Sequence, residues 1–272
     1  MYFIDTHAHI DMLKKLTPEE AVARSGSEGV KYIINVGSSL EGSRKSVEFA
    51  GRFAGVFASV GIHPHYVKDF GDKEIKMLES LIQGGDMEAV YSDIGKDSKY
   101  SKVVAIGETG FDFYRNLSPR KDMEKAFVSH IELALKYDIP VIIHDRDAHR
   151  ETIDIVKKYA GNNRFKAVVH CFSGDIDFAS QCLEMGLYIS FTGIITFPNA
   201  RDIIKVVEKV PLERIFIETD SPFLAPQSKR GKENYPGFVK YVAEKIAEIK
   251  GLSIDEIADI TSKNAEGFFS LK

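Results

Sequence analysis

The chain has few cysteines, no long apolar run and little net charge, and each absence excludes a class of protein. Two cysteines in 272 residues are too few for a disulfide scaffold, so we expect a reducing, cytoplasmic setting. Because no run of about 18 apolar residues and no basic leader occur, we expect no membrane span and no signal peptide. The 36 basic and 40 acidic residues give a net charge of −4, which argues against coating nucleic acid through a broad basic surface.

Short apolar segments alternate with amphipathic ones along the whole chain. Almost uniformly apolar segments are typical of strands that are covered on both faces. The strands we expect are Tyr2–His7, Lys31–Val36, Gly55–Gly61, Lys102–Gly107, Pro140–His144, Lys166–His170, Leu187–Phe191 and Arg214–Glu218. The helices between them include Pro119–Tyr137, Ala148–Tyr159, Phe178–Met185 and Ile203–Lys209. Eight such alternations predict an α/β fold, a TIM (β/α)8 barrel forming a single domain over residues 1–272, with a doubly wound open sheet as the alternative.

Three segments depart from the simple alternation. Gln83–Tyr100 is a polar insertion before the fourth strand, and Ala225–Pro236 is a long loop after the eighth. Ser253–Phe269 predicts an additional C-terminal helix whose two terminal phenylalanines pack onto the barrel. Ser118-Pro119 is typical of a helix start, and two histidines inside predicted helices, His130 and His149, are assigned to helix surfaces.

The other six histidines and two acidic residues gather at the ends of predicted strands. They are His7 and His9, His63 and His65, Glu108, His144, His170 and Asp220. The carboxyl ends of parallel barrel strands open onto one face, where active sites are built, so we expect these side chains to converge. Chance would scatter histidines more evenly along the chain.

Four imidazoles and two carboxylates offer more ligands than one tetrahedral zinc ion requires. We therefore expect two divalent metal cations that share a ligand, and Glu108 can bridge them because each of its oxygens can bind one ion. Paired ions activate water and hold the attacking and leaving oxygens of a phosphoryl transfer. The mixed nitrogen and oxygen donors suit Zn, Mn, Co or Ni, and also Mg where the imidazoles are only partly engaged.

Several motifs in a fixed order resemble those of the TatD-type metal-dependent deoxyribonucleases, within the amidohydrolase-like TIM-barrel hydrolases. The matching segments run from the N-terminus past residue 220: Asp5-Thr6-His7-Ala8-His9, Gly61-Ile62-His63-Pro64-His65, Ile106-Gly107-Glu108-Thr109-Gly110-Phe111-Asp112, Ile143-His144-Asp145-Arg146-Asp147-Ala148, His170-Cys171-Phe172-Ser173-Gly174 and Glu218-Thr219-Asp220-Ser221-Pro222.

The resemblance implies a role for each ligand. His7, His9 and Asp220 would hold one metal, His144 and His170 the other, and Glu108 would bridge. Other hydrolases of the superfamily often place a carboxylated lysine where this chain has Glu108, which favours the nuclease branch. The chain departs from the family pattern in Asn234-Tyr235-Pro236, where tyrosine replaces the expected glutamate.

Four further residues are candidates for substrate binding. His63 can hydrogen-bond the scissile phosphate or orient the water, or it can simply end its strand; His65 can bind substrate or only order its loop. The guanidinium of Arg146 can present two donors to a phosphate, with an ion pair to a neighbouring aspartate as the alternative. Arg115 can meet the nucleic-acid backbone or cap a helix.

The sequence therefore predicts a cytoplasmic phosphodiesterase that hydrolyses DNA by removing nucleotides from an end, with RNA as the alternative substrate. Asp220 takes or orients the proton of the attacking water, Glu108 keeps the ions spaced, and His63 assists. The alternatives are a metal-dependent ester or amide hydrolase, such as an aminoacyl-tRNA deacylase, and a non-catalytic metal-binding scaffold. We expect no membrane association and no obligate protein partner.

Overall fold

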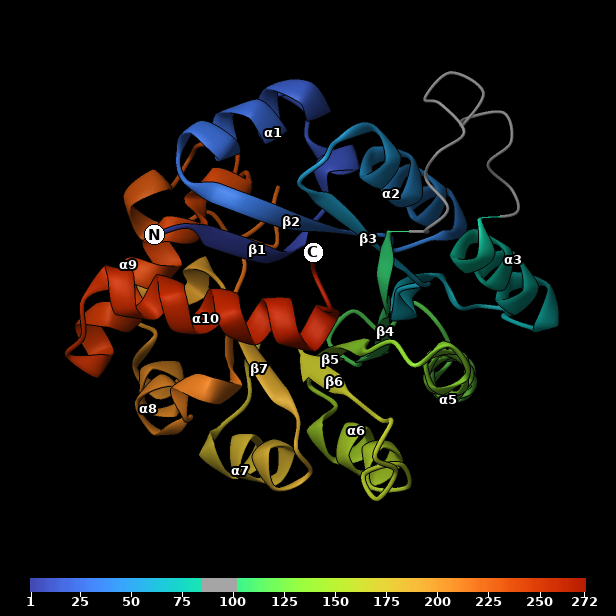
Figure 1. Ribbon diagram of the computed structural model, residues 1–272. Helices are drawn as coiled ribbons and strands as arrows, with labels where there is room; N and C mark the ends of the chain where they lie inside the picture. Colours follow the sequence, from blue (N-terminus) through green and yellow to red (C-terminus); the bar gives the residue numbers. More distant parts are fainter. Residues whose placement is uncertain (85–101) are drawn as a thin grey trace. The chain divides into compact units, whose positions relative to one another are not determined.

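The computed structural model describes residues 1–84 and 102–272, and its eight parallel strands follow one another in the order of the chain (Figure 1). This is the architecture of a TIM-like α/β barrel, so the predicted fold class is confirmed. The strands are β1 (Phe3–Ala8), β2 (Val30–Val36), β3 (Val56–Val60), β4 (Val103–Asp112), β5 (Val141–Arg146), β6 (Ala167–Val169), β7 (Tyr188–Phe191) and β8 (Ile215–Ile217).

Helices alternate with the strands as the apolar pattern predicted. They are α1 (Pro18–Ser27), α2 (Leu40–Arg52), α3 (Asp72–Gln83), α5 (Arg120–Tyr137), α6 (His149–Val156), α7 (Ile176–Glu184), α8 (Arg201–Lys209), α9 (Val239–Lys250) and α10 (Ile254–Phe269). Short 3-10 turns include η2 (Pro64–Tyr66) after β3, and η5 (Gln227–Lys229) and η6 (Pro236–Phe238) after β8. In the described ranges, no helix has both the length and the apolar character needed to cross a membrane.

The chain divides into two compact units. Unit 1 comprises Met1–Ile34 and Val168–Lys272, and unit 2 comprises Asn35–Ala167. The expectation of a single domain over residues 1–272 stays a prediction.

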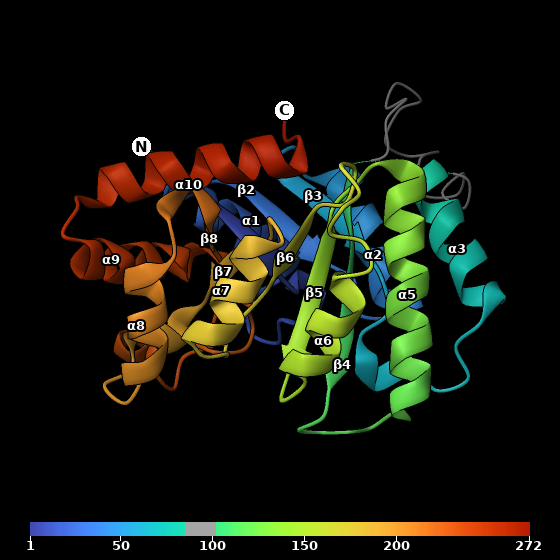
Figure 2. The same cartoon turned by 90° about the horizontal axis from the view of Figure 1, so that it is seen from below.

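In unit 1, the additional C-terminal helix α10 packs against β1 (Figure 1) and β8 (Figure 2). The Asn264 side-chain amide donates to the carbonyl oxygen of Ile215 at 3.0 Å, at the first residue of β8. The rings of Phe268 and Phe269 lie 5.1 and 5.5 Å from the ring of Phe216 in β8. The predicted helix and the packing of its phenylalanines are thus confirmed.

In unit 2, α5 runs alongside β4 (Figure 2) and buries His130. The assignment of His130 to a helix surface was wrong. Its Nδ1 donates to the Ala126 carbonyl at 2.7 Å, and its Nε2 accepts the Ile62 N–H at 3.1 Å, so both ring nitrogens have partners. Burial lowers the pKa of His130 to about 4, although the bond to Ala126 opposes this. The neutral ring thereby fixes the backbone that leads into His63.

Strand β4 runs to Asp112, whereas the sequence predicted an end at Gly107. The φ angles of Gly107 and Gly110 are +129° and +138°, a region that favours glycine, and a Cβ at Gly110 would clash with the His144 carbonyl oxygen. These glycines therefore allow a close approach to β5 and do not end the strand. The pairing register with β5 shifts around Glu108, which lies within β4 and not after it.

The segment before α5 also differs from its prediction. The helix begins at Arg120 without a side-chain cap, and the Ser118 hydroxyl donates to the His65 carbonyl at 3.0 Å instead of capping the helix. The predicted polar insertion Gln83–Tyr100 lies, beyond Gly84, outside the described residues.

Candidate metal centre

Unit 1 gathers four of the six expected ligands into one group, here called the unit 1 cluster. His7 and His9 come from the end of β1, His170 follows β6, and Asp220 follows β8. The Nε2 atoms of His7 and His9 lie 3.2 Å apart, and Asp220 Oδ1 lies 3.8 and 3.6 Å from them. The rings of His7 and His170 are stacked with centroids 4.0 Å apart.

The spacing within the unit 1 cluster fits a divalent cation. Tetrahedral ligands with bonds of about 2.0–2.1 Å have donor atoms about 3.3–3.4 Å apart. The three separations among His7, His9 and Asp220 lie close to this value. His7, His170 and Asp220 also offer donor atoms that lie within 4.8 Å of one another. Bringing the donor atoms of two imidazoles and a carboxylate this close together is energetically favourable when a cation lies between them.

Backbone hydrogen bonds set the spacing of this cluster. The Asp220 N–H donates to the His7 carbonyl at 2.9 Å, and the His9 N–H donates at 2.7 Å to the carbonyl of the residue after Asp220. The buried Asp5 carboxylate accepts the Thr219 N–H at 2.9 Å and the Thr219 hydroxyl at 2.6 Å. Burial raises the pKa of Asp5 well above its usual value, and the Thr219 bonds oppose this. Asp5 therefore positions Asp220.

Glu218 orients the remaining imidazole of unit 1. Its side chain is buried, and its Oε1 accepts the Cys171 N–H at 2.7 Å and lies 3.5 Å from His170 Nδ1. A carboxylate beside the second nitrogen of a ligating imidazole fixes the ring and raises its basicity.

Unit 2 holds a second group, the unit 2 cluster, made of His63, His65, Glu108, Asp112 and His144. Glu108 Oε2 lies 3.5 Å from His144 Nδ1 and 3.9 Å from His63 Nε2. The rings of His63 and His144 meet edge to face with centroids 4.4 Å apart. Glu108 and His144, both expected as ligands, are thus brought together with His63, one of the three expected catalytic residues.

The Asp112 carboxylate contacts two histidines and one backbone N–H in the unit 2 cluster. Its Oδ2 lies 2.8 Å from His65 Nε2 and 3.4 Å from His144 Nε2, and its Oδ1 accepts the Arg115 N–H at 2.7 Å. Burial favours the neutral acid, but the bonds from His144, the Arg115 N–H and His65 together hold the pKa of Asp112 well below its usual range. The carboxylate therefore stays ionised and orients both imidazoles.

Comparison with known proteins identifies the family. The family described as "TatD related DNase" matches residues 4–270. The chain belongs to this family. YabD of Bacillus subtilis, named an uncharacterized metal-dependent hydrolase, is 36% identical over 98% of this chain and 98% of its own. A Cronobacter sakazakii protein named 3'-5' ssDNA/RNA exonuclease TatD is 29% identical over 92% of this chain and 91% of its own.

A solved structure agrees with the assignment. The crystal structure of YJJV, a TatD homologue from Escherichia coli K12, matches with a TM-score of 0.85 at 27% identity and covers 99% of this chain and 98% of that one. This chain is therefore a TatD-family metal-dependent hydrolase with a TIM-like α/β barrel.

Within this TatD-family chain, the loop Ala225–Pro236 departs from the expected motif at a buried residue. The Tyr235 hydroxyl donates to Glu28 Oε1 at 2.6 Å, and its ring lies under the Arg24 guanidinium at 4.6 Å. Burial and the bond to Glu28 raise the pKa of Tyr235. The Asn234 amide donates to the Thr219 carbonyl at 2.9 Å. Tyr235 thus anchors the loop to α1.

The two arginines predicted to bind substrate are both exposed. The Arg146 guanidinium lies 4.1 Å from the Tyr114 ring centroid, an arrangement that the sequence analysis did not consider. Asp145, one of the two neighbouring aspartates suggested as its ion-pair partner beside Asp147, bonds instead with His149 and with Thr152. Arg115 joins the unit 2 cluster through its backbone N–H. Phosphate binding by either guanidinium stays a prediction.

Sequence reasoning assigned no positioning role to three carboxylates, although all three lie in the quoted motifs. Asp5 precedes His7 by two residues, Glu218 precedes Asp220 by two, and Asp112 ends the motif that contains Glu108. The available signal was the period of two, because alternate residues of a strand face the same side.

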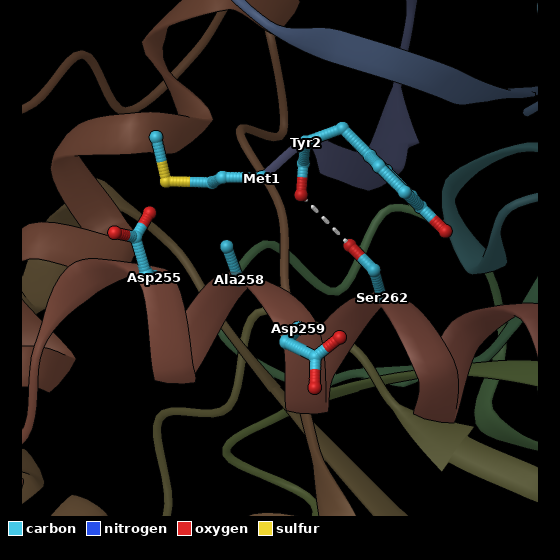
Figure 3. Close-up of a pocket in the computed structure, with 6 residues that line it drawn as sticks. All are labelled: Met1, Tyr2, Asp255, Ala258, Asp259 and Ser262. Atoms are coloured by element: carbon cyan, nitrogen blue, oxygen red, sulfur yellow. Dashed lines mark hydrogen bonds between the residues drawn. The ribbon is translucent and has the colours of Figure 1, made fainter.

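A shallow pocket of about 250 Å³ lies at the opposite end of β1 from His7 and His9 (Figure 3). The start of the chain and one side of α10 line it, and the Ser262 hydroxyl donates to the Tyr2 carbonyl at 3.1 Å. One of its two carboxylates, Asp259, pairs with Lys263 at 2.8 Å. The pocket therefore offers no ligand set comparable to the unit 1 cluster.

Proposed function

We propose that this TatD-family hydrolase is a deoxyribonuclease, a phosphodiesterase that removes nucleotides from DNA ends and also accepts RNA. The observation that carries the proposal is the spacing of His7, His9 and Asp220, which suits a divalent cation. The family description and the name of the Cronobacter relative support a phosphodiester substrate.

We propose two divalent cations, drawn from Zn, Mn, Co, Ni and Mg. His7, His9 and Asp220 would hold one, and His144 and His170 the other. Bridging by Glu108 remains a prediction from the sequence. When bound, the cations supply the positive charge that lowers the pKa of a water molecule and stabilises a phosphoryl group under attack.

The chain's own residues then have distinct tasks. The partly exposed Asp220 carboxylate accepts the proton of the attacking water, and Asp5 holds Asp220 in place through Thr219. His63, beside Glu108, donates a hydrogen bond to a phosphate oxygen. Asp112 fixes His65 and His144 against rotation.

A second candidate is an ester or amide hydrolase, such as an aminoacyl-tRNA deacylase, because the same donors would also polarise a carbonyl. Assaying nucleotide release and ester hydrolysis with the same metal separates the two functions. Ester turnover without nucleotide release would favour the second.

The test uses labelled single-stranded DNA, protein freed of metal by chelation, and added divalent cation. We expect Asp220→Asn and Glu108→Gln to lower kcat/KM by about a hundredfold or more, because each change removes one negative charge at nearly constant shape. The matched control is Asp154→Asn, at an exposed carboxylate in α6, which should cleave normally. Undiminished cleavage by both cluster variants would overturn the mechanism.

A further inference from the structure

Among the described residues of unit 2, three large apolar side chains are exposed, and all three follow the carboxyl ends of β3 and β4. They are Tyr66, Tyr114 and Leu117, with exposed fractions of 61%, 60% and 63%. A ring in solvent forgoes the favourable free energy of burial. Single exposed apolar residues are ordinary, so the surroundings of the two tyrosines decide what they do.

Tyr66 lies beside the histidines of the unit 2 cluster. It directly follows His63-Pro64-His65 in η2, and its ring centroid lies 6.3 Å from those of His63 and His65. A nucleotide whose phosphate meets His63 would therefore have its base within reach of the Tyr66 ring.

The positively charged guanidinium of Arg146 lies over the ring of Tyr114. The Arg146 guanidinium lies 4.1 Å from the ring centroid, which is a cation–π geometry. The Phe113 N–H donates to the Arg146 carbonyl at 2.9 Å, so the tyrosine and the arginine sit on adjoining backbone segments. A base stacked on Tyr114 would thus have a guanidinium at hand for a neighbouring phosphate.

The backbone beneath both rings is fixed, although the rings are exposed. Ser118 donates to the His65 carbonyl at 3.0 Å, and His65 and the Arg115 N–H both bond to Asp112. The loop after β4 and the turn after β3 are therefore tied to one carboxylate. Fixed groups lose little conformational entropy when they bind a ligand.

We propose that Tyr66 and Tyr114 stack against unpaired nucleobases, so that the enzyme selects single-stranded nucleic acid. This inference rests on the proposed nuclease function. The chain has a net charge of −4, so a broad basic surface does not supply affinity for a polyanion. Aromatic rings supply it without sequence preference, because every base has a π-face, whereas in a duplex neighbouring pairs cover the faces of all but the terminal bases.

The test measures binding and cleavage separately. Binding of a labelled single-stranded oligonucleotide is followed by fluorescence anisotropy in chelator, and kcat and KM are measured with added cation. We expect Tyr66→Ala and Tyr114→Ala each to raise Kd and KM about tenfold with kcat nearly unchanged. Tyr66→Phe and Tyr114→Phe should bind as the wild type does, because stacking needs the ring and not the hydroxyl.

Two matched controls isolate stacking. Leu117→Ala removes an equally exposed apolar side chain from the same loop and should leave Kd unchanged. An oligonucleotide that lacks bases at its terminal nucleotides should bind the wild type and the alanine variants alike. Unchanged Kd in both alanine variants, equal losses on the base-free oligonucleotide, or failure of phenylalanine to restore binding would overturn the proposal.

Two further outcomes distinguish a failure of base stacking from a failure of the proposed nuclease function. Ring-dependent binding without cleavage of any oligonucleotide would leave the stacking intact and overturn the nuclease function. If the alanine variants lost a self-association that the wild type shows in sedimentation, and bound the oligonucleotide as the wild type does, the tyrosines would be a contact between copies of the chain. That result would overturn the stacking.

Discussion

The unit 1 and unit 2 clusters are held in place by different kinds of bond. In unit 1, backbone bonds between β1 and the segment after β8 set the spacing of His7, His9 and Asp220. In unit 2, side-chain contacts with Asp112 hold the rings of His65 and His144. Backbone bonds do not change with protonation, whereas contacts of imidazoles with carboxylates do. We infer that the spacing of His7, His9 and Asp220 is largely preset and that the ring orientation of His65 and His144 depends on charge.

Neutralising the positioning carboxylate that serves each cluster, Asp5 in unit 1 and Asp112 in unit 2, should show this difference most strongly. We expect Asp112→Asn to lower kcat/KM by about 10- to 100-fold. An amide has one accepting oxygen, whereas the histidines and the Arg115 N–H use both oxygens of the Asp112 carboxylate. We expect Asp5→Asn to cost less than about tenfold, since the amide can accept the Thr219 N–H and donate to the Thr219 hydroxyl oxygen. Steady-state kinetics on single-stranded DNA measures both.

The control for this pair is Asp147→Asn. Asp147 is exposed and has φ +56°, a conformation that asparagine adopts readily, so activity should be unchanged. Equal losses in the Asp5 and Asp112 variants would contradict the contrast between preset and charge-dependent geometry.

Acid should weaken unit 2 through His130. Burial lowers the pKa of its neutral imidazole to about 4, against 6.5 when unfolded. The unfolded chain therefore binds the proton first as pH falls. Stability should be full above pH 6.5, fall between pH 6.5 and 4, and lose about 3 kcal/mol from this residue in total. About 2 kcal/mol of that loss should be present at pH 5.

Urea unfolding at pH 7 and pH 5 measures this effect, and hydrogen exchange locates it. The variant His130→Gln keeps an acceptor for the Ile62 N–H and removes the titration, so its stability should vary less between the two pH values. Amides around Ile62 should lose protection at pH 5 in the wild type before those of β1 do. The same pH slope in His130→Gln would assign the acid sensitivity to other groups.

Sequence reasoning predicted the strands well because buried parallel strands are short apolar runs. The ligand assignment, made from the polar residues that end those runs, stays a prediction. Sequence reasoning failed where tertiary contacts decide. The predicted fourth strand ended at Gly107, but Gly107 and Gly110 permit close approach of β5. His130 was placed on a surface because its acceptor role depends on Ile62, far away in the sequence. No local pattern reveals that Asp112 ties two separate histidines together.

The smallest expected effect concerns Tyr235, which anchors the loop after β8 in unit 1. Its loss should change the free energy of unfolding and not the activity. We expect Tyr235→Phe to lower the free energy of unfolding by about 1 kcal/mol, the worth of one hydrogen bond. The loss is limited because Lys240 lies 3.3 Å from Glu28 and keeps its carboxylate paired. Thermal unfolding should show a fall of about 2–4 °C in Tm, with kcat/KM within about twofold. A clear loss of activity at unchanged Tm would instead give the Tyr235 hydroxyl a direct part in the reaction, because its anchoring bond would then carry no stability.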